Sequence, residues 1–238
     1  MKIQILELIE GAKKAEGLTV VIDVFRAMSL EAYMFAQGAK VVYPIGSLEE
    51  AFAMKRENPA RILCGERGGR KVEGCDYGNS PSQIAGADLR GKTIIHSTSA
   101  GTQGIVNAVH ADEIVTAALV NARAVAEYIR SRDPQVVSIV AMGYAGIRRA
   151  NEDLLCAQYI KSVLENDPLP VQECADALRT NGGEQFFDPQ NQEVFPEADF
   201  YLCTKCDRFR FVSGIGLDEQ GRRIARPVWG EVAGSGRL

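Results

Sequence analysis

Short apolar runs rich in β-branched residues alternate along this chain with stretches in which apolar positions recur at helical spacing. Leu18–Val24 is one such run, too short for a helix and apolar enough for a strand that is buried on both faces. The pattern predicts strands over Lys2–Ile9, Leu18–Val24, Lys40–Ile45, Arg61–Cys64, Lys92–His96, Asp112–Leu119 and Gln135–Met142. It predicts helices over Ser29–Gly38, from Ser47 to Glu57, from Ser80 and Pro81 onward, and over Thr102–His110, Ala122–Arg132 and Glu152–Leu164.

Capping signals support several of these helix boundaries. Ser47 and Glu50 have the spacing of a capping box, in which the serine hydroxyl accepts from the amide of the glutamate and the glutamate side chain reaches back. Gly38 suits the end of a helix because glycine tolerates the left-handed conformation. Side-chain caps at the starts of three further helices are expected from Ser80, Asn121 and Asn151.

Repeated alternation of strands and helices favours a layered α/β/α fold with a predominantly parallel, or mixed, sheet. The polar segment 179–192 is loop-like. We therefore expect residues 1–238 to form a single α/β domain, or two lobes with a C-terminal appendage from about residue 180. Phe209–Leu217 and Arg222–Val228 are predicted to pair as a hairpin in that appendage, and the tail after Trp229 is expected to be loose.

Composition narrows the class of protein. Hydrophobic residues make up 46% and charged residues 24% of the 238 residues, as in ordinary globular proteins, which argues against disorder. The net charge of −4 and the lack of a basic run argue against nucleic acid as a partner. No apolar run is long enough to span a membrane, and the first residues lack a signal-peptide core. We expect a cytoplasmic protein whose six cysteines are free thiols.

Four polar clusters lie where predicted elements end or begin. They are Asp23–Arg26, Gly65–Arg70, Ser97–Thr102 and Asn151–Asp153, and the first three directly follow predicted strands. Because the carboxyl ends of parallel strands face one crevice, we expect the clusters to meet in space. Together they supply carboxylates for a metal, arginines for an anion, and amides and hydroxyls for phosphate oxygens. This inventory suits chemistry on a small phosphorylated acid.

The carboxylates of these clusters have more than one interpretation. Asp23 closes a buried strand, where a charge is costly unless it is paired or bound to a cation. It could bind magnesium or attack phosphorus as a nucleophile, or it could form an ion pair with Arg26 that braces the turn. Glu152 and Asp153 lie in the first turn of a helix, where the dipole stabilises acids, and would gain a function by meeting Asp23 around a cation.

The glycine-rich loop carries two arginines, Arg67 and Arg70, whose planar groups suit phosphate, carboxylate or sulfonate. A solvated surface loop is the alternative, but a loop this long more often carries a site. Cys64 and Arg70 also have the spacing found in cysteine-dependent phosphatases. We interpret this match as chance, because Glu66 would place a negative charge in the phosphate cradle and no clear helix follows.

The Ser/Thr-rich segment Ser97–Thr102 joins a strand to a helix, so its amides and hydroxyls could bind phosphate or could simply cap the helix. It is not a P-loop, since the glycine and lysine pattern is missing. His96 could assist acid–base chemistry, although a buried structural histidine is the more ordinary reading. Cys203 and Cys206 form a lone Cys-x2-Cys pair without the further ligands that a zinc site needs.

In combination these motifs resemble the 2-phosphosulfolactate phosphatase family over about residues 3 to 165. The motifs that carry the resemblance are Val20–Ala27, Gly65–Arg70, Gly78–Pro81, the stretch ending at Thr102, Glu152–Leu154 and the pair Cys156-Ala157. The resemblance implies a layered α/β enzyme that depends on magnesium and converts 2-phospho-3-sulfolactate into 3-sulfolactate, on the route to coenzyme M. The chain departs from the family pattern at Met28-Ser29 and Ala100, which bears on the substrate more than on the reaction type.

The resulting hypothesis assigns roles to individual residues. Catalysis is expected from Asp23, Arg26 and Glu66; substrate binding from Arg67, Arg70, Asn79, Ser97, Ser99, Gly101 and Thr102; and binding of Mg²⁺ from Asp23, Glu152 and Asp153. Water or Asp23 itself would attack phosphorus. Two alternatives stay open: a phosphatase acting on another small phosphorylated carboxylic acid, and a non-catalytic anion-binding domain. The expected partner is a small anionic phospho-acid, with neither nucleic acid nor membrane, and a homo-oligomer is compatible with the sequence.

Overall fold

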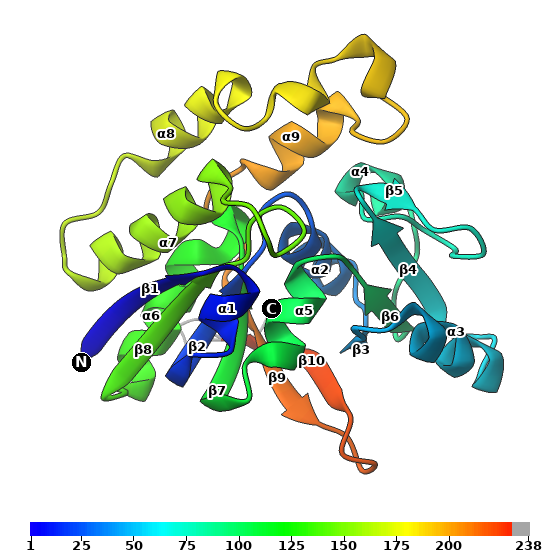
Figure 1. Ribbon diagram of the computed structural model, residues 1–238, viewed down its shortest axis with the longest axis horizontal. Helices are drawn as coiled ribbons and strands as arrows, with labels where there is room; N and C mark the ends of the chain where they lie inside the picture. The colour runs from blue at the N-terminus through cyan, green and yellow to red at the C-terminus, as the bar shows by residue number, and fades with distance from the viewer. Residues whose placement is uncertain (230–238) are drawn as a thin grey trace, which may run out of the picture.

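The computed structural model describes residues 1–229, so the expected loose tail lies outside the described residues. The predicted α/β class is confirmed (Figure 1). The strands are β1 Lys2–Glu7, β2 Glu16–Ile22, β3 Val41–Pro44, β4 Ile62–Arg67, β5 Arg70–Lys71, β6 Thr93–Ser97, β7 His110–Ala117, β8 Val136–Ala141, β9 Phe211–Leu217 and β10 Arg223–Trp229. The α-helices are α1 Leu8–Ala12, α2 Ala27–Ala36, α3 Leu48–Glu57, α4 Pro81–Ile84, α5 Gly101–Asn107, α6 Ala122–Arg132, α7 Asn151–Leu164, α8 Val171–Ala177 and α9 Glu197–Cys203.

One mixed sheet contains all ten of these strands, in the order β1-β8-β2-β7-β9-β10-β3-β6-β4-β5. Strands β1, β8, β2 and β7 form one parallel block, and β3, β6 and β4 form a second. The antiparallel hairpin β9–β10 lies between the two blocks and joins β7 to β3. The hairpin prediction is therefore confirmed, and its place is inside the sheet.

Buried apolar strands explain why the larger parallel block is stable. The last five residues of β2, Leu18–Ile22, are all buried, and so are the last five of β8, Val137–Ala141. Helices α6 and α7 pack on one another and on this block, while α1 and α5 pack on one another and on its other face (Figure 1). Covering both faces with helices is what a parallel sheet of apolar strands requires.

A helical cap, Val171–Cys203, lies above the carboxyl end of β2 (Figure 1). It contains α8 and α9 and, between them, three short 3₁₀ turns (Leu178–Thr180, Glu184–Phe186 and Pro189–Asn191) where residues 179–192 were predicted to be loop. Its aromatic rings hold it in place: Phe186 packs edge-on against Phe25 at 4.9 Å between ring centroids, and Phe200 lies 5.9 Å from Phe25. The cap thus closes one side of the region in which the four polar clusters meet.

Several predicted boundaries are wrong, each for a local reason. The first strand stops at Glu7 because Leu8 adopts a left-handed conformation (φ 65°) and starts α1. The helix predicted to reach His110 ends at Asn107, because His110 begins β7 and pairs with Glu16. The predicted glycine-rich loop contains the end of β4 and the whole of β5, which pair with one another.

Three predicted helix caps are also wrong, because the side chains bond elsewhere. The hydroxyl of Ser80 donates to the distant Asp199, and the side-chain NH₂ of Asn151 donates to the carbonyl of Asn181. The side-chain oxygen of Asn121 accepts from the backbone amide of Ala118, in the 3₁₀ turn before the helix. At Ser47 the hydroxyl does accept from the amide of Glu50, which is the first half of the predicted capping box. Within residues 1–229, no helix is both long enough and apolar enough to cross a bilayer.

Candidate active site

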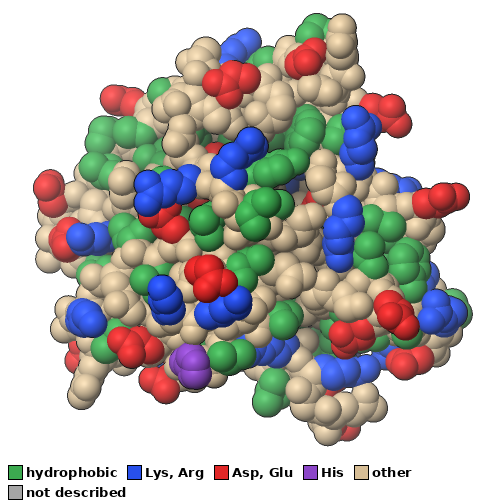
Figure 2. Space-filling model, viewed as in Figure 1, with side chains coloured by type: hydrophobic (Ala, Val, Ile, Leu, Met, Phe, Trp, Pro, Cys, Tyr) green, Lys and Arg blue, Asp and Glu red, His purple; other side chains and the backbone are tan. Residues whose placement is uncertain are grey.

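A cavity of about 460 Å³ gathers residues from all four polar clusters. Asp23–Arg26, Glu66–Gly69, Ser99–Ala100 and Asn151–Asp153 each contribute lining residues, as the carboxyl-end argument predicted. The loop Gly143–Ala150 after β8 and the helical cap complete the walls. On this face the surface is hollowed between the cap and that loop, with Lys and Arg side chains around the hollow (Figure 2).

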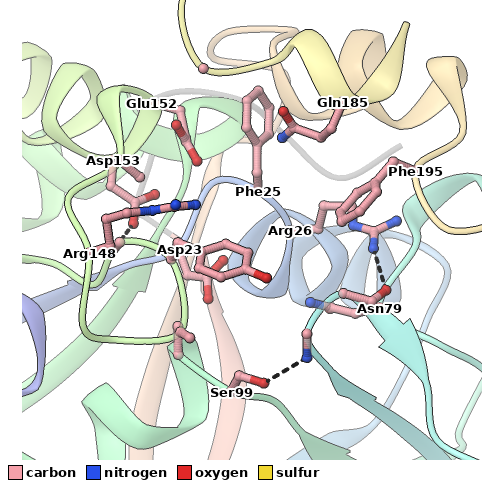
Figure 3. A pocket seen from close by; sticks show the side chains of 18 of the residues that line it. Asp23, Phe25, Arg26, Asn79, Ser99, Arg148, Glu152, Asp153, Gln185 and Phe195 are labelled. Atoms are coloured by element: carbon pink, nitrogen blue, oxygen red, sulfur yellow. Dashed lines mark hydrogen bonds between the residues drawn. The ribbon is translucent and has the colours of Figure 1, made fainter. Parts of the chain in front are cut away.

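Asp23 lies at the end of β2 and points into the cavity (Figure 3). Its Oδ1 accepts from the amide of Ala27 at 3.0 Å, in the first turn of α2. Gly101 lies against the same carboxylate, since a Cβ at this position would be 3.0 Å from Oδ2 of Asp23. Burial raises the pKa of Asp23, the amide of Ala27 opposes this shift, and the negative charge of Glu66 adds to it.

Arg26 does not brace Asp23 as an ion pair, so that alternative is wrong. The guanidinium pairs with Asp199 of the helical cap at 2.8 Å, and the two side chains are 2% and 0% exposed. It also donates to the carbonyls of Val194 and Gly69, each at 2.9 Å, and lies over the ring of Phe195. Arg26 therefore ties the cap to the glycine-rich loop at the edge of the cavity.

Glu66 connects two of the clusters through backbone amides. Its Oε1 accepts from the amide of Ser99 at 2.6 Å, and its Oε2 accepts from the amide of Gly69 at 2.7 Å. The hydroxyl of Ser99 in turn donates to Oε2 at 3.3 Å. The buried carboxylate thus fixes the two loops that form this side of the cavity.

Asp153 joins the loops that follow β2 and β8. Its Oδ1 accepts from the amide of Val24 and its Oδ2 from the amide of Gly143, both at 2.7 Å. Burial raises the pKa of Asp153, and the negative charges of Glu152 and Asp23 raise it further. Burial and the charge of Asp23 likewise raise the pKa of Glu152. The negative charge of Asp23 therefore opposes the ionisation of both Glu152 and Asp153, and that of Glu152 opposes the ionisation of Asp153.

Five of the residues predicted to bind substrate do not line this cavity: Arg67, Arg70, Ser97, Gly101 and Thr102. Arg67 donates to the carbonyl of Gly46 at 3.3 Å and to the hydroxyl of Ser97 at 3.1 Å, so its fork holds two loops together. Thr102 bonds to Thr98 within the turn that starts α5. Arg70 lines a smaller adjoining hollow, which shares Arg26 and Asn79 with the cavity.

Other residues of the site were not predicted from the sequence. One group is the loop Gly143–Ala150, which carries Arg148 and Arg149 to the mouth of the cavity. Gln185 and Phe195 of the helical cap are two more. A signal for the loop was present, because it follows the predicted strand Gln135–Met142 at its carboxyl end, as the other clusters follow theirs. No comparable signal marks the cap residues, which reach the site through tertiary packing alone.

The donor set of the cavity suits a hard divalent cation. Asp23, Glu66, Glu152, Asp153 and Glu184 all line it, and of its three arginines Arg26 is paired with Asp199 and Arg149 with Glu7. Within residues 1–229 no group of three or more His, Cys, Asp or Glu side chains is arranged to hold a metal. Mg²⁺ needs only one or two carboxylates beside waters and phosphate oxygens, and the carboxylates that would supply them are those of Asp23 and Glu152, which both line the cavity.

Comparison with known proteins places this geometry in a family. The family model described as 2-phosphosulpholactate phosphatase matches residues 3–214. A probable 2-phosphosulfolactate phosphatase of Bacillus subtilis is 31% identical over 217 residues, 89% of this chain and 92% of the relative. A protein of the same description from Carboxydothermus hydrogenoformans is 42% identical over 165 residues, 69% of this chain and 68% of the relative. One from Clostridium perfringens is 34% identical over 222 residues, 86% of this chain and 89% of the relative.

The matched region runs from β1 into β9 and so includes every cluster that lines the cavity. It is longer than the stretch of about residues 3 to 165 over which the sequence resemblance was expected. The chain belongs to the 2-phosphosulfolactate phosphatase family of phosphoric monoester hydrolases.

Proposed function

We propose that this protein is a magnesium-dependent phosphatase that hydrolyses 2-phospho-3-sulfolactate to 3-sulfolactate and phosphate. The observation that carries the proposal is the cavity itself, which the carboxylates of Asp23, Glu152 and Asp153 line together and in which burial raises the pKa of each. A substrate with three acidic groups would be repelled by such a site without a cation. A bound divalent cation would offset the repulsion among the carboxylates and the repulsion between them and the anionic substrate. This explains how acidic residues can line a site for an anion.

Within this proposal each carboxylate has a distinct part. Asp23 and Glu152 hold the magnesium ion, which when bound would polarise the phosphoryl group and neutralise charge in the transition state. Asp153 keeps the loops after β2 and β8 in register through the amides of Val24 and Gly143. Glu66 orients the segment at Ser99, which lines the cavity, by accepting from both the amide and the hydroxyl of Ser99 (Figure 3).

Two routes of attack on phosphorus are compatible with the position of Asp23. Water can attack with Asp23 accepting a proton, or Asp23 can attack and form an aspartyl phosphate that water then hydrolyses. Reduction with borohydride during turnover separates them. The covalent route forms an acyl phosphate at Asp23 that borohydride reduces to homoserine, whereas direct attack by water leaves Asp23 unmodified.

The test of the proposal is turnover of Asp23→Asn at saturating magnesium. We expect a loss of at least about 100-fold in kcat, because both proposed roles of Asp23 need its negative charge. Asp88→Asn, which alters an exposed carboxylate paired with Arg90 on the surface, is the matched control. Near-normal turnover by a folded Asp23→Asn protein would refute the proposed role of Asp23.

Metal and substrate dependence complete the test. Chelation of divalent ions should abolish phosphate release, and added magnesium should restore it. In a panel of phosphorylated acids, 2-phospho-3-sulfolactate should be preferred over esters that lack the sulfonate, such as 2-phospholactate and phosphoglycerate. Preference for another phosphorylated carboxylic acid would replace the substrate in this proposal, and tight binding without phosphate release would support an anion-binding domain instead.

A further inference from the structure

We propose that Arg148 recognises the acidic group that the substrate carries beside its phosphate, the sulfonate or the carboxylate. This inference rests on the proposed function, because it assigns a residue to the part of the substrate that does not react. It concerns the loop Gly143–Ala150, which connects β8 to α7 and forms one wall of the cavity. No motif in the sequence had marked this loop as part of the site.

The pairing of the cavity's arginines singles out Arg148. Arg26 is buried against Asp199 at 2.8 Å, and Arg149 pairs with Glu7 of β1 at 2.6 Å. Arg148 makes no ion pair and no side-chain hydrogen bond within residues 1–229. It is therefore the cavity's unpaired arginine among the described residues, and its charge is available to a bound anion.

The backbone fixes where Arg148 can reach. Its amide donates to the carbonyl of Tyr144 at 3.2 Å, and its carbonyl accepts from the amide of Tyr144 at 2.8 Å, which closes the loop. Gly143 permits this closure, since its φ is +65° and a Cβ there would lie 2.2 Å from the carbonyl oxygen of Arg148. The amide of Gly143 is in turn held by Asp153. The same carboxylate that belongs to the acidic cluster thus anchors the loop that presents Arg148.

The side chain of Arg148 is exposed at the mouth of the cavity and rests over the ring of Tyr144, with its Cζ 4.7 Å from the ring centroid. In Figure 3 it extends from beside Asp153 across the cavity, on the side opposite Asn79 and Phe195. The phosphate is expected deeper, beside the ion held by Asp23 and Glu152. An arginine at the rim is then placed for a group that projects from the reacting end toward solvent.

The chemistry of guanidinium fits this assignment. Its planar fork donates two parallel hydrogen bonds to carboxylate or sulfonate oxygens, and it is more weakly hydrated than an ammonium group. Because the guanidinium of Arg148 makes no hydrogen bond or ion pair among the described residues, its N–H groups are free to bind an anion. Removing a charge-assisted pair of this kind should lower kcat/KM by about 10- to 100-fold for a substrate that uses it.

The experiment compares three esters. They are 2-phospho-3-sulfolactate, 2-phospholactate (which lacks the sulfonate) and 2-sulfoethyl phosphate (which lacks the carboxylate). For Arg148→Ala we expect the 10- to 100-fold loss with 2-phospho-3-sulfolactate, expressed mainly in KM. If Arg148 binds the sulfonate, the loss disappears with 2-phospholactate and persists with 2-sulfoethyl phosphate. If Arg148 binds the carboxylate, the loss persists with 2-phospholactate and disappears with 2-sulfoethyl phosphate.

Two further variants separate contact from charge. Arg148→Lys keeps the charge but lacks the planar guanidinium. With the esters that carry the anion bound by Arg148, its kcat/KM should fall nearly as far as that of Arg148→Ala. Arg149→Ala removes the same charge from the neighbouring position, and any effect it has should be equal for all three esters. Thermal unfolding of each variant checks that the fold is intact.

Equal losses of Arg148→Ala with all three esters would overturn the inference, because the residue would then act on the phosphate or on the loop. An unchanged kcat/KM with 2-phospho-3-sulfolactate would overturn it as well. Wild-type protein that hydrolyses none of the three esters would instead refute the proposed function, and with it the inference that depends on it.

Discussion

The substitution Asp199→Asn tests the ion pair that holds the helical cap to the active site. Asp199 has no exposed surface, and its Oδ2 accepts from Arg26 while its Oδ1 accepts from the hydroxyl of Ser80 and the amide of Ser82. An asparagine has the same shape but only one accepting oxygen, so it can accept either from Arg26 or from Ser80 and Ser82, and not from both. If its oxygen accepts from Ser80 and Ser82, its NH₂ group faces the guanidinium of Arg26, and two donors then oppose each other.

The magnitude follows from what remains around Arg26. The guanidinium would keep its hydrogen bonds to the carbonyls of Val194 and Gly69 but would lose the only negative charge with which it pairs among residues 1–229. Breaking a buried ion pair by removal of one partner costs about 3 to 5 kcal/mol. Since the asparagine keeps the contacts with Ser80 and Ser82, we expect the lower value, about 3 kcal/mol. For a chain of this size that corresponds to a fall in Tm of about 6 to 12 °C.

The assay is thermal unfolding of the wild-type protein and the variant, followed by circular dichroism at pH 7. Asp88→Asn is the matched control, because Asp88 pairs with Arg90 at 2.9 Å on the surface and its loss should change Tm little. A fall of less than about 2 °C for Asp199→Asn would refute the reasoning. It would mean that Arg26 finds another partner or is not held in the buried position described here.

Two further predictions use the same measurements. Gly101→Ala should cost about 1 to 3 kcal/mol and reduce kcat, because its Cβ would lie 2.6 Å from Cε of Met28 and 3.0 Å from Oδ2 of Asp23. Gly86→Ala is the control and should change neither stability nor kcat, because no atom lies within 4 Å of the new Cβ. Equal effects of Gly101→Ala and Gly86→Ala would contradict the prediction. Burial lowers the pKa of His96 to about 4, so the unfolded chain binds this proton more readily and stability is lost as pH falls from about 6.5 toward 4. The wild-type protein should therefore lose more unfolding free energy between pH 7 and pH 4.5 than His96→Gln does, by about 2 to 3 kcal/mol. Chemical denaturation at the two pH values measures this, and the same loss in both proteins would contradict the prediction.

Local patterns were enough to predict the α/β class and the main strands. Runs such as Leu18–Val24 and Gln135–Met142 are apolar, β-branched and too short for a helix, so no other element competes for them. Short helices were harder to predict. α1 has five residues and α9 has seven, and such lengths are stable only through the tertiary contacts that they make.

The candidate site shows a similar division. The carboxyl-end rule brought together Asp23, Glu66 and Glu152 because the rule concerns backbone topology, which the order of elements determines. It could not tell which polar group each side chain would bond. The guanidinium of Arg67 donates to the backbone carbonyls of Ser97 and Gly46. Arg26 pairs with Asp199, which lies 173 residues away in the sequence and which no local pattern marks as its partner.

The place of the β9–β10 hairpin has a consequence for synthesis on the ribosome. Strands β7 and β3 are made long before the two strands that will lie between them, so each parallel block of a nascent chain ends in an open edge. Open edges pair readily with other chains. A chain that stops before Phe211 would leave both edges uncovered, so premature termination should yield aggregates instead of a smaller working enzyme.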